Sequence, residues 1–152
     1  MQEVQAYIDG GCRDNPGLGG WGVVLHGDHE RELWGAVPST TNNQMELTAA
    51  IKALEALKNP CHVVIFTDSN YVRQGMTEWL ENWKRNGWRT TSKKPVKNQE
   101  LWEQLDALSQ QHEVEWNWVQ GHSGNPGNER ADRLVNEAMD NFLANQPRCQ
   151  VP

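Results

Sequence analysis

Four carboxylates stand in the sequence where charged side chains are uncommon. Asp9 lies near the end of a predicted strand, and Asp68 directly follows the most apolar predicted strand. Glu46 and Asp132 each stand beside an apolar position of a predicted helix. Ligands in open α/β sheets gather at the carboxyl ends of strands, where Asp9 and Asp68 are expected. A cluster of oxygen ligands without His or Cys selects a hard cation, Mg²⁺ or Mn²⁺.

Each of these carboxylates, taken alone, also has an ordinary structural interpretation. Asp9 could belong to a turn, and Asp68 could cap the helix that follows it. Glu46 could favour a helix N-terminus through its charge, and Asp132 could pair with a neighbouring arginine. Spacing alone leaves both interpretations open. If the four side chains converge, their like charges raise their pKa values unless cations neutralise them.

A change of hydrophobic period shows which elements must position these residues. Alternating apolar and polar residues predict strands over 4–9, 21–25 and 32–37, which short links join into an antiparallel meander. Gly10 and Gly11 are expected to end the first strand. The later elements are a helix from 41 to 58, a buried strand over 62–67, a helix from 68, a helix capped by Asn98, a strand over 113–119 and a helix that begins at Asn125-Pro126.

Length and composition bound the protein class. The 152 residues predict a single domain over 1–143, with a flexible tail over 144–152. Apolar runs stay well below the ~20 residues of a membrane span, and the chain opens without a signal-peptide pattern. Three Cys without a C-x-x-C spacing argue against a disulfide framework and a Cys-based zinc site. We therefore expect a cytoplasmic protein with free thiols and no membrane partner.

The distribution of charge points to a nucleic-acid partner although the chain is acidic overall. The net charge is −6, yet residues 79–98 hold six basic side chains and only one acidic side chain. Trp79, Trp83 and Trp88 are interleaved with these basic residues. A local excess of one sign steers a charged partner more than the total charge does. This basic segment is therefore expected to contact phosphates, with at least one Trp packing it onto the body of the protein.

Five strings of the sequence occur in an order and spacing typical of one enzyme family. They are D-G-G-C-R-D-N-P-G, T-T-N-N-Q-M-E-L, T-D-S-N-Y-V, W-x-x-N-W-K-R-N-G-W-R and G-H-S-G-N-P-G-N-E-R-A-D. Each string is a weak signal alone, but together they closely resemble the signature segments of bacterial type 1 ribonuclease H. The resemblance runs from about Val4 to about Phe142, and the fourth string resembles a basic protrusion, here at about 79–98.

The resemblance implies an α/β ribonuclease H-like fold, with a five-stranded mixed sheet whose first three strands are antiparallel and which helices flank. It implies a monomeric endonuclease whose partner is an RNA–DNA hybrid. The enzyme would hydrolyse the RNA strand and leave 5′-phosphate and 3′-hydroxyl ends. Alternatives are a hybrid-binding module that does not cleave, and another nuclease or a transposase of the same superfamily.

The resemblance also assigns the chemistry. It maps the family's four metal-binding acids onto Asp9, Glu46, Asp68 and Asp132, and its mobile histidine onto His122. With substrate bound, two Mg²⁺ ions are expected, with Mn²⁺ as a substitute, because two ions ~3.5–4 Å apart activate water and stabilise the leaving oxygen. Asp9 is expected to bridge both ions, and Asp132 to hold the ion that activates water. Glu46 and Asp68 would hold the other ion, and His122 would pass protons near neutral pH.

Substrate contacts follow from the same resemblance. The 2′-hydroxyl of RNA is expected to be recognised through the backbone of Cys12 and Asn15 and by Asn43, Asn70, Gln74 and Glu46. Thr41 and Asn98 match positions that in the family grip a phosphate of the DNA strand. Further expected substrate contacts in the basic segment are Trp79, Lys84, Arg85 and Arg89, with the basic side chains on backbone phosphates. Gly11, Ile8 and Gln120 depart from the residues usual in the family, but none of these departures removes an expected metal ligand.

Overall fold

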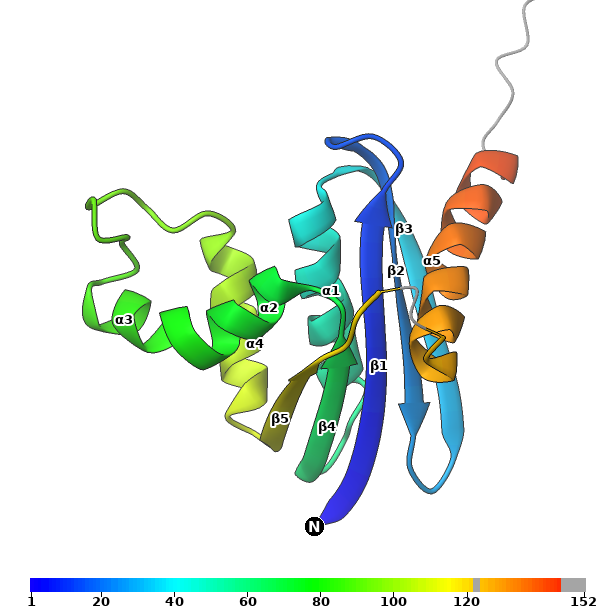
Figure 1. Cartoon of the computed structure of the whole chain (residues 1–152), viewed down its shortest axis with the longest axis horizontal. Helices are drawn as coiled ribbons and strands as arrows, with labels where there is room; N and C mark the ends of the chain where they lie inside the picture. Colours follow the sequence, from blue (N-terminus) through cyan, green and yellow to red (C-terminus); the bar gives the residue numbers. More distant parts are fainter. Residues whose placement is uncertain (122–123, 146–152) are drawn as a thin grey trace, which may run out of the picture.

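The computed structural model describes residues 1–121 and 124–145, and its centre is a single five-stranded sheet. The strands are β1 (Gln2–Cys12), β2 (Gly17–His26), β3 (Glu30–Thr40), β4 (Cys61–Thr67) and β5 (Glu113–Trp118). They lie in the order β3-β2-β1-β4-β5 (Figure 1). The pairs β1–β2 and β2–β3 are antiparallel, whereas β1–β4 and β4–β5 are parallel. The predicted mixed sheet with an antiparallel first half is confirmed.

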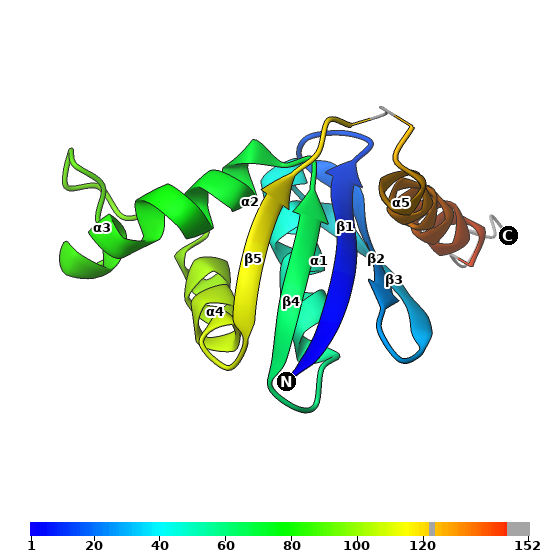
Figure 2. The ribbon, with the colours of Figure 1, turned by 60° about the horizontal axis from the view of Figure 1, so that its bottom comes forward.

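Helices cover both faces of this sheet (Figures 1 and 2). On one face lies α1 (Asn42–Glu55), with α4 (Gln99–Ser109) beside it, and α5 (Pro126–Ala144) lies on the other. Between β4 and α4 the chain forms α2 (Asn70–Gln74), the π-helical turn η1 (Gly75–Trp79) and α3 (Leu80–Arg85). These three project away from the sheet (Figure 2). Within the described residues, no helix combines the length and the apolar character needed to cross a membrane.

Two apolar cores hold the layers together. The larger core lies under α1 and includes Ile8, Leu54 and Ile65, all without exposed surface. The smaller core lies under α5, where Ala131 and Leu134 pack on Val24. Burying aliphatic side chains of this size stabilises the fold by ~1.5–3 kcal/mol each. Both faces of β1 and β2 are therefore fixed, and so is the end of the sheet where the candidate site lies.

The predicted helix starts are confirmed at two places. The hydroxyl of Thr41 accepts a hydrogen bond from the backbone N–H of Gln44 at 3.2 Å. The side chain of Asn125 accepts one from the N–H of Asn128 at 3.0 Å, and α5 begins at Pro126. Each cap satisfies a backbone donor that the first helical turn leaves open.

The first strand is longer than its sequence pattern predicts. Gly10 and Gly11 do not end it but pair with Trp21 and Gly20 of β2, and β1 continues to Cys12. Position 10 has no room for a side chain, because a Cβ there would stand 2.5 Å from the backbone oxygen of Met45. Gly10 therefore allows the backbone of α1 to lie directly against the strand.

The helix that was expected from residue 68 is interrupted by the π-helical turn η1. Its first residue, Gly75, lies where any Cβ would overlap the ring of Trp102, which is fully buried. A π turn commonly marks such a local constraint in a helix. Asn98 stands at the N-cap position of the next helix as predicted, but its side chain does not form the capping hydrogen bond. Asn98 has a left-handed backbone, and its side chain bonds Gln44 and Tyr71 instead, each at 3.2 Å.

Candidate active site

Three of the four singled-out carboxylates meet at one end of the sheet. Asp9 lies near the end of β1, Asp68 directly follows β4, and Glu46 reaches them from α1. One oxygen from each of these side chains lies within 4.8 Å of the others. Because β1 and β4 are parallel neighbours, their carboxyl ends share one edge of the sheet. This arrangement has the oxygen ligands that a hard divalent cation takes.

Glu46 is fixed by the glycine that lets α1 approach β1. The N–H of Gly10 donates to Oε1 of Glu46 at 2.9 Å. The second oxygen, Oε2, is buried and has no hydrogen-bond partner in the described structure. Only 7% of Glu46 is exposed, so water does not satisfy this oxygen freely. A buried carboxylate oxygen left unpaired beside two other acids fits a metal ligand.

Asp68 is fixed by the end of β5. The indole N–H of Trp118 donates to the backbone oxygen of Asp68 at 3.0 Å. Gly121 lies against the Asp68 side chain, since a Cβ there would stand 2.8 Å from Oδ2. The loop after β5 therefore passes close to the carboxylates only because residue 121 has no side chain.

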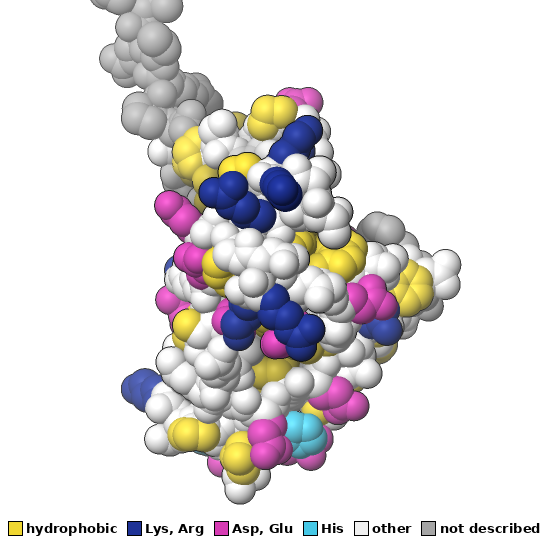
Figure 3. All heavy atoms as spheres, turned by 90° about the vertical axis from the view of Figure 1, so that its left-hand side faces the viewer, with side chains coloured by type: hydrophobic (Ala, Val, Ile, Leu, Met, Phe, Trp, Pro, Cys, Tyr) yellow, Lys and Arg dark blue, Asp and Glu magenta, His cyan; other side chains and the backbone are white. Residues whose placement is uncertain are grey.

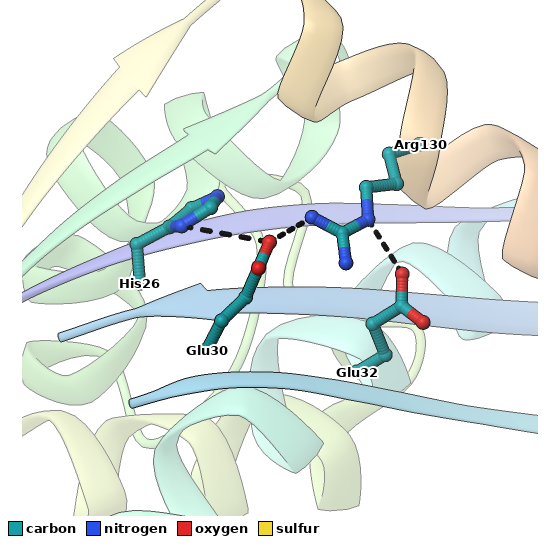
Figure 4. Close-up of polar contacts among 4 residues, drawn as sticks. All are labelled: His26, Glu30, Glu32 and Arg130. Atoms are coloured by element: carbon teal, nitrogen blue, oxygen red, sulfur yellow. Dashed lines mark hydrogen bonds and ion pairs between the residues drawn. The ribbon is translucent and has the colours of Figure 1, made fainter. Parts of the chain in front are cut away.

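Asp132 approaches the cluster from α5 and lies near enough to Asp9 to raise the pKa of that carboxyl. It does not pair with Arg130, which was one alternative. Arg130 instead forms an ion pair with Glu30 and donates to Oε2 of Glu32 at 2.6 Å (Figure 4). These contacts tie the first turns of α5 to β3 and so help to place Asp132 beside Asp9.

The carboxylates disturb one another strongly in the absence of a cation. Burial, the charge of Asp68, and the hydrogen bond and charge of Asp132 raise the pKa of Asp9 from 3.8 to about 8. Burial and the charges of Asp9 and Asp68 raise the pKa of Glu46 well above its usual value. Bound cations would reverse this effect because they stabilise the ionised forms.

A pH-dependent stability of the metal-free protein follows from the raised pKa of Asp9. The folded state binds this proton more tightly than the unfolded state, so the stability contribution is complete below about pH 4 and is lost as the pH rises through about 8. Urea unfolding in EDTA, from about pH 4 to about pH 9, should show wild type losing stability relative to Asp9→Asn. A stability difference that stays constant over this range would contradict the prediction.

The loop after β1 is held by Asn42, the first residue of α1. Oδ1 of Asn42 accepts from the N–H of Cys12 at 2.7 Å, and the N–H of Asn42 donates to Asn15 at 3.1 Å. Asn43 beside it is exposed. Capping by Thr41 and bridging by Asn42 thus leave the Asn43 side chain at the surface, where it was expected to meet RNA.

The other expected substrate residues lie along α2 and the start of α4. Asn70 is exposed in the first turn of α2, and Gln74 is half-buried at its end. Asn98 is held between Gln44 and Tyr71, which links the start of α4 to α1 and α2. His122, the expected proton-transfer residue, lies outside the described residues.

The basic segment is anchored by aromatic rings that pack in tilted and edge-on pairs. The ring centroid of Trp83 lies 5.8 Å from that of Trp79, 6.5 Å from that of Trp88 and 5.2 Å from that of Trp102. The alternative that a Trp of this segment packs it onto the body therefore holds for Trp83. Its neighbour Lys84 forms an ion pair with Asp106 at 3.2 Å.

The exposed charges of the basic segment face one side of the molecule. Arg85 and Arg89 are exposed, and neither forms an ion pair with a described residue. Figure 3 shows Lys and Arg side chains in two groups on the face seen from the α3 side. The basic segment therefore presents positive charge to solvent that no described acidic side chain neutralises.

A five-stranded mixed sheet in this order, with acids gathered at the ends of β1 and β4, defines the ribonuclease H-like class of α/β proteins. The sequence model of the RNase H family matches residues 1–140. The chain belongs to this family, and it is therefore an enzyme of the nuclease class.

Individual relatives agree over nearly the whole chain. The chain is 63% identical to a ribonuclease H of Halorhodospira halophila, over 93% of this chain and 95% of the relative. It is 58% identical to one of Alcanivorax borkumensis, over 96% and 97%. Among solved structures it is similar to LC9-RNase H1, described as a type 1 RNase H with the type 2 active-site motif. The TM-score is 0.84 and the identity 33%, over 93% of this chain and 74% of that one. It is also similar to LC11-RNase H1, solved in complex with an RNA/DNA hybrid, with a TM-score of 0.70, 27% identity, and coverage of 92% and 99%.

Proposed function

We propose that the chain hydrolyses the RNA strand of RNA–DNA hybrids internally, with Mg²⁺ held by Asp9, Glu46, Asp68 and Asp132. The observation that carries this proposal is the convergence of the first three carboxylates within 4.8 Å, with an unpaired buried oxygen on Glu46. When bound, two divalent ions supply charge neutralisation at the phosphate and an activated water. Mn²⁺ offers the same preference for oxygen ligands and would substitute.

The residues of the chain then prepare the site for these ions and for the substrate. Burial and mutual repulsion disfavour the ionised forms of the carboxylates when no cation is bound. Divalent cations would relieve this repulsion, so the cluster favours their binding. Gly10 orients Glu46 through its N–H, and Trp118 fixes the backbone of Asp68. His122 would move a proton, since an unperturbed imidazole titrates near neutral pH.

Recognition of the hybrid is divided between two surfaces. The RNA strand would meet the backbone of Cys12 and Asn15 and the amide side chains of Asn43, Asn70 and Gln74, because amides both donate and accept hydrogen bonds to a 2′-hydroxyl. The DNA strand would meet Thr41, Asn98 and the basic segment with Trp79, Lys84, Arg85 and Arg89. The protein would act as a monomer in the cytoplasm.

Cleavage of an end-labelled RNA–DNA hybrid with and without Mg²⁺ tests the proposal. We expect internal cuts in the RNA strand only, with 5′-phosphate and 3′-hydroxyl ends, and none in EDTA. Double-stranded DNA and double-stranded RNA are the matched control substrates. Hybrid binding without cleavage in Mg²⁺ or Mn²⁺ would instead support the non-cleaving module.

The salt dependence of binding should identify the side chains of the basic segment that neutralise phosphates. Each phosphate that a protein neutralises contributes roughly 0.9 to the log–log salt slope. Arg85→Ala with Arg89→Ala should therefore lower the slope by roughly twice this value and raise KM while kcat stays nearly unchanged. Lys84→Ala should change the slope less, since Lys84 already pairs with Asp106.

Lys58→Ala is the matched control for this measurement, because Lys58 lies near the surface beside the opposite end of β4. Its salt slope should equal that of wild type. An unaltered slope and KM in the double Arg variant would show that the segment is structural rather than part of the hybrid-binding surface.

A further inference from the structure

A pocket outside the carboxylate cluster lies between α2 and the end of β5. Its volume is about 360 Å³, and it is lined by Asn70, Arg73, Trp116, Asn117 and Trp118. Asn70 and Arg73 are three residues apart, so they share one side of α2. The lining combines a guanidinium, two amides and two indole rings, which is a set of groups that binds nucleotides.

Arg73 supplies a positive charge that the protein itself does not neutralise. Its side chain is half-buried and forms no ion pair within residues 1–121 and 124–145. The chain has six more acidic than basic residues, so an arginine without an acidic partner is conspicuous here. A guanidinium presents parallel N–H donors that match the oxygens of a phosphate.

Trp118 supplies an aromatic surface at the same pocket. Its side chain is large and apolar, and yet the residue is 43% exposed. Its indole N–H is already used by the backbone oxygen of Asp68. The ring is therefore held in place by one edge, and the rest of the ring remains available for stacking with a base.

The pocket adjoins the backbone of Asp68. Trp118 bonds the backbone of Asp68, and Asn70 follows Asp68 by two residues. The pocket places the guanidinium of Arg73, which forms no ion pair with a described residue, on the helix that follows Asp68.

We propose that this pocket is a subsite for the RNA-strand nucleotide next to the scissile bond, with Arg73 on its phosphate and Trp118 stacked against its base. The inference rests on the proposed function, because the scissile bond is placed at the carboxylates. The RNA strand is the occupant rather than the DNA strand because the pocket adjoins Asp68. The positive charges assigned to the DNA strand lie in the basic segment that begins at the end of η1.

Hybrids of different length test this subsite. A short central run of ribonucleotides fixes the cleavage site, and the cleaved strand is shortened one nucleotide at a time from its 5′ end in one series and from its 3′ end in the other. In wild type, kcat/KM should drop by roughly tenfold at one step of one series, because one charge-assisted hydrogen bond is lost at that step. In Arg73→Ala this step should flatten, so that the ratio of kcat/KM between the long and the short hybrid falls by the same factor.

The same step should be visible in affinity, measured by fluorescence anisotropy without a divalent ion. A protein that binds hybrids but does not cleave them therefore still tests the pocket, and failure of the proposed function stays distinguishable from failure of the subsite. Lys58→Ala is the matched control and should keep the wild-type step. A wild-type profile without a step in either series, or a step that Arg73→Ala retains in full, would overturn the proposal.

Two substitutions of Trp118 separate stacking from its contact with Asp68. Trp118→Phe keeps an aromatic face but removes the N–H that Asp68 accepts, whereas Trp118→Leu removes both. Stacking predicts that only the Leu variant flattens the length step, by about five- to hundredfold in affinity. If Phe and Leu reduce cleavage equally at every length, Trp118 acts by positioning Asp68, and the stacking part of the proposal is wrong.

Discussion

Asp9→Asn is expected to abolish cleavage while the protein still folds and binds RNA–DNA hybrids. Asn has the size of Asp but lacks its charge, and a carboxylate oxygen of Asp9 lies within 4.8 Å of an oxygen of Glu46 and of Asp68. Removing one preorganised electrostatic group from an active site typically costs about 10²–10³-fold in kcat, and a ligand shared by two ions should cost at least the upper figure. Single-turnover cleavage in saturating Mg²⁺ measures this loss directly.

Asp28→Asn is the matched control, because Asp28 is exposed in the turn between β2 and β3. It should cleave like wild type. Metal binding gives a second readout, since Mg²⁺ should raise the unfolding temperature of wild type and of Asp28→Asn more than that of Asp9→Asn. Near-normal turnover of folded Asp9→Asn would refute the assignment of Asp9 as a metal ligand.

The location of the carboxylates could be predicted because it depends on local signals. Asp9 and Asp68 stand at strand ends that short apolar patterns define, and parallel strands bring such ends together. Capping by Thr41 and Asn125 was equally predictable, since a cap involves residues only three apart. For the caps, the sequence interval that carries the signal also forms the contact, whereas the meeting of Asp9, Glu46 and Asp68 depends on how β1, α1 and β4 pack together.

The contacts that shape the site could not be predicted in the same way, because their partners are distant in sequence. Gly10 was expected to end a strand, whereas its lack of a side chain admits the backbone at Met45 and so brings Glu46 to its place. Trp102 buries its ring against Gly75, a pairing that no periodicity within either helix reveals. Such contacts depend on how layers pack, which a single sequence does not encode as a local pattern.

The charge of the basic segment could likewise be predicted from the sequence, whereas the contacts of its residues could not. The excess of basic residues over 79–98 is plain in the sequence, but its use is not. Lys84 is paired with Asp106 of α4, so it anchors the segment as well as charging it. Arg73 lies outside the segment and carries no ion pair among the described residues, which makes it the better candidate for a phosphate beside the site.

His122→Ala is expected to slow cleavage by about 10²–10⁴-fold without abolishing it, because a positioned acid–base group contributes a factor of that size. His122 lies outside the described residues, and Gly121, which precedes it in the sequence, lies against the Asp68 side chain. The four carboxylates remain in this variant, so Mg²⁺ and hybrid affinities should stay close to those of wild type.

His29→Ala, at an exposed histidine of the β2–β3 turn, is the matched control. The deciding measurement is kcat of His122→Ala beside Asp9→Asn and wild type in the same Mg²⁺ concentration across neutral pH. The kcat of the His variant should fall between those of wild type and Asp9→Asn. A variant as inactive as Asp9→Asn, or as active as wild type, would show that His122 is not an accessory proton-transfer residue.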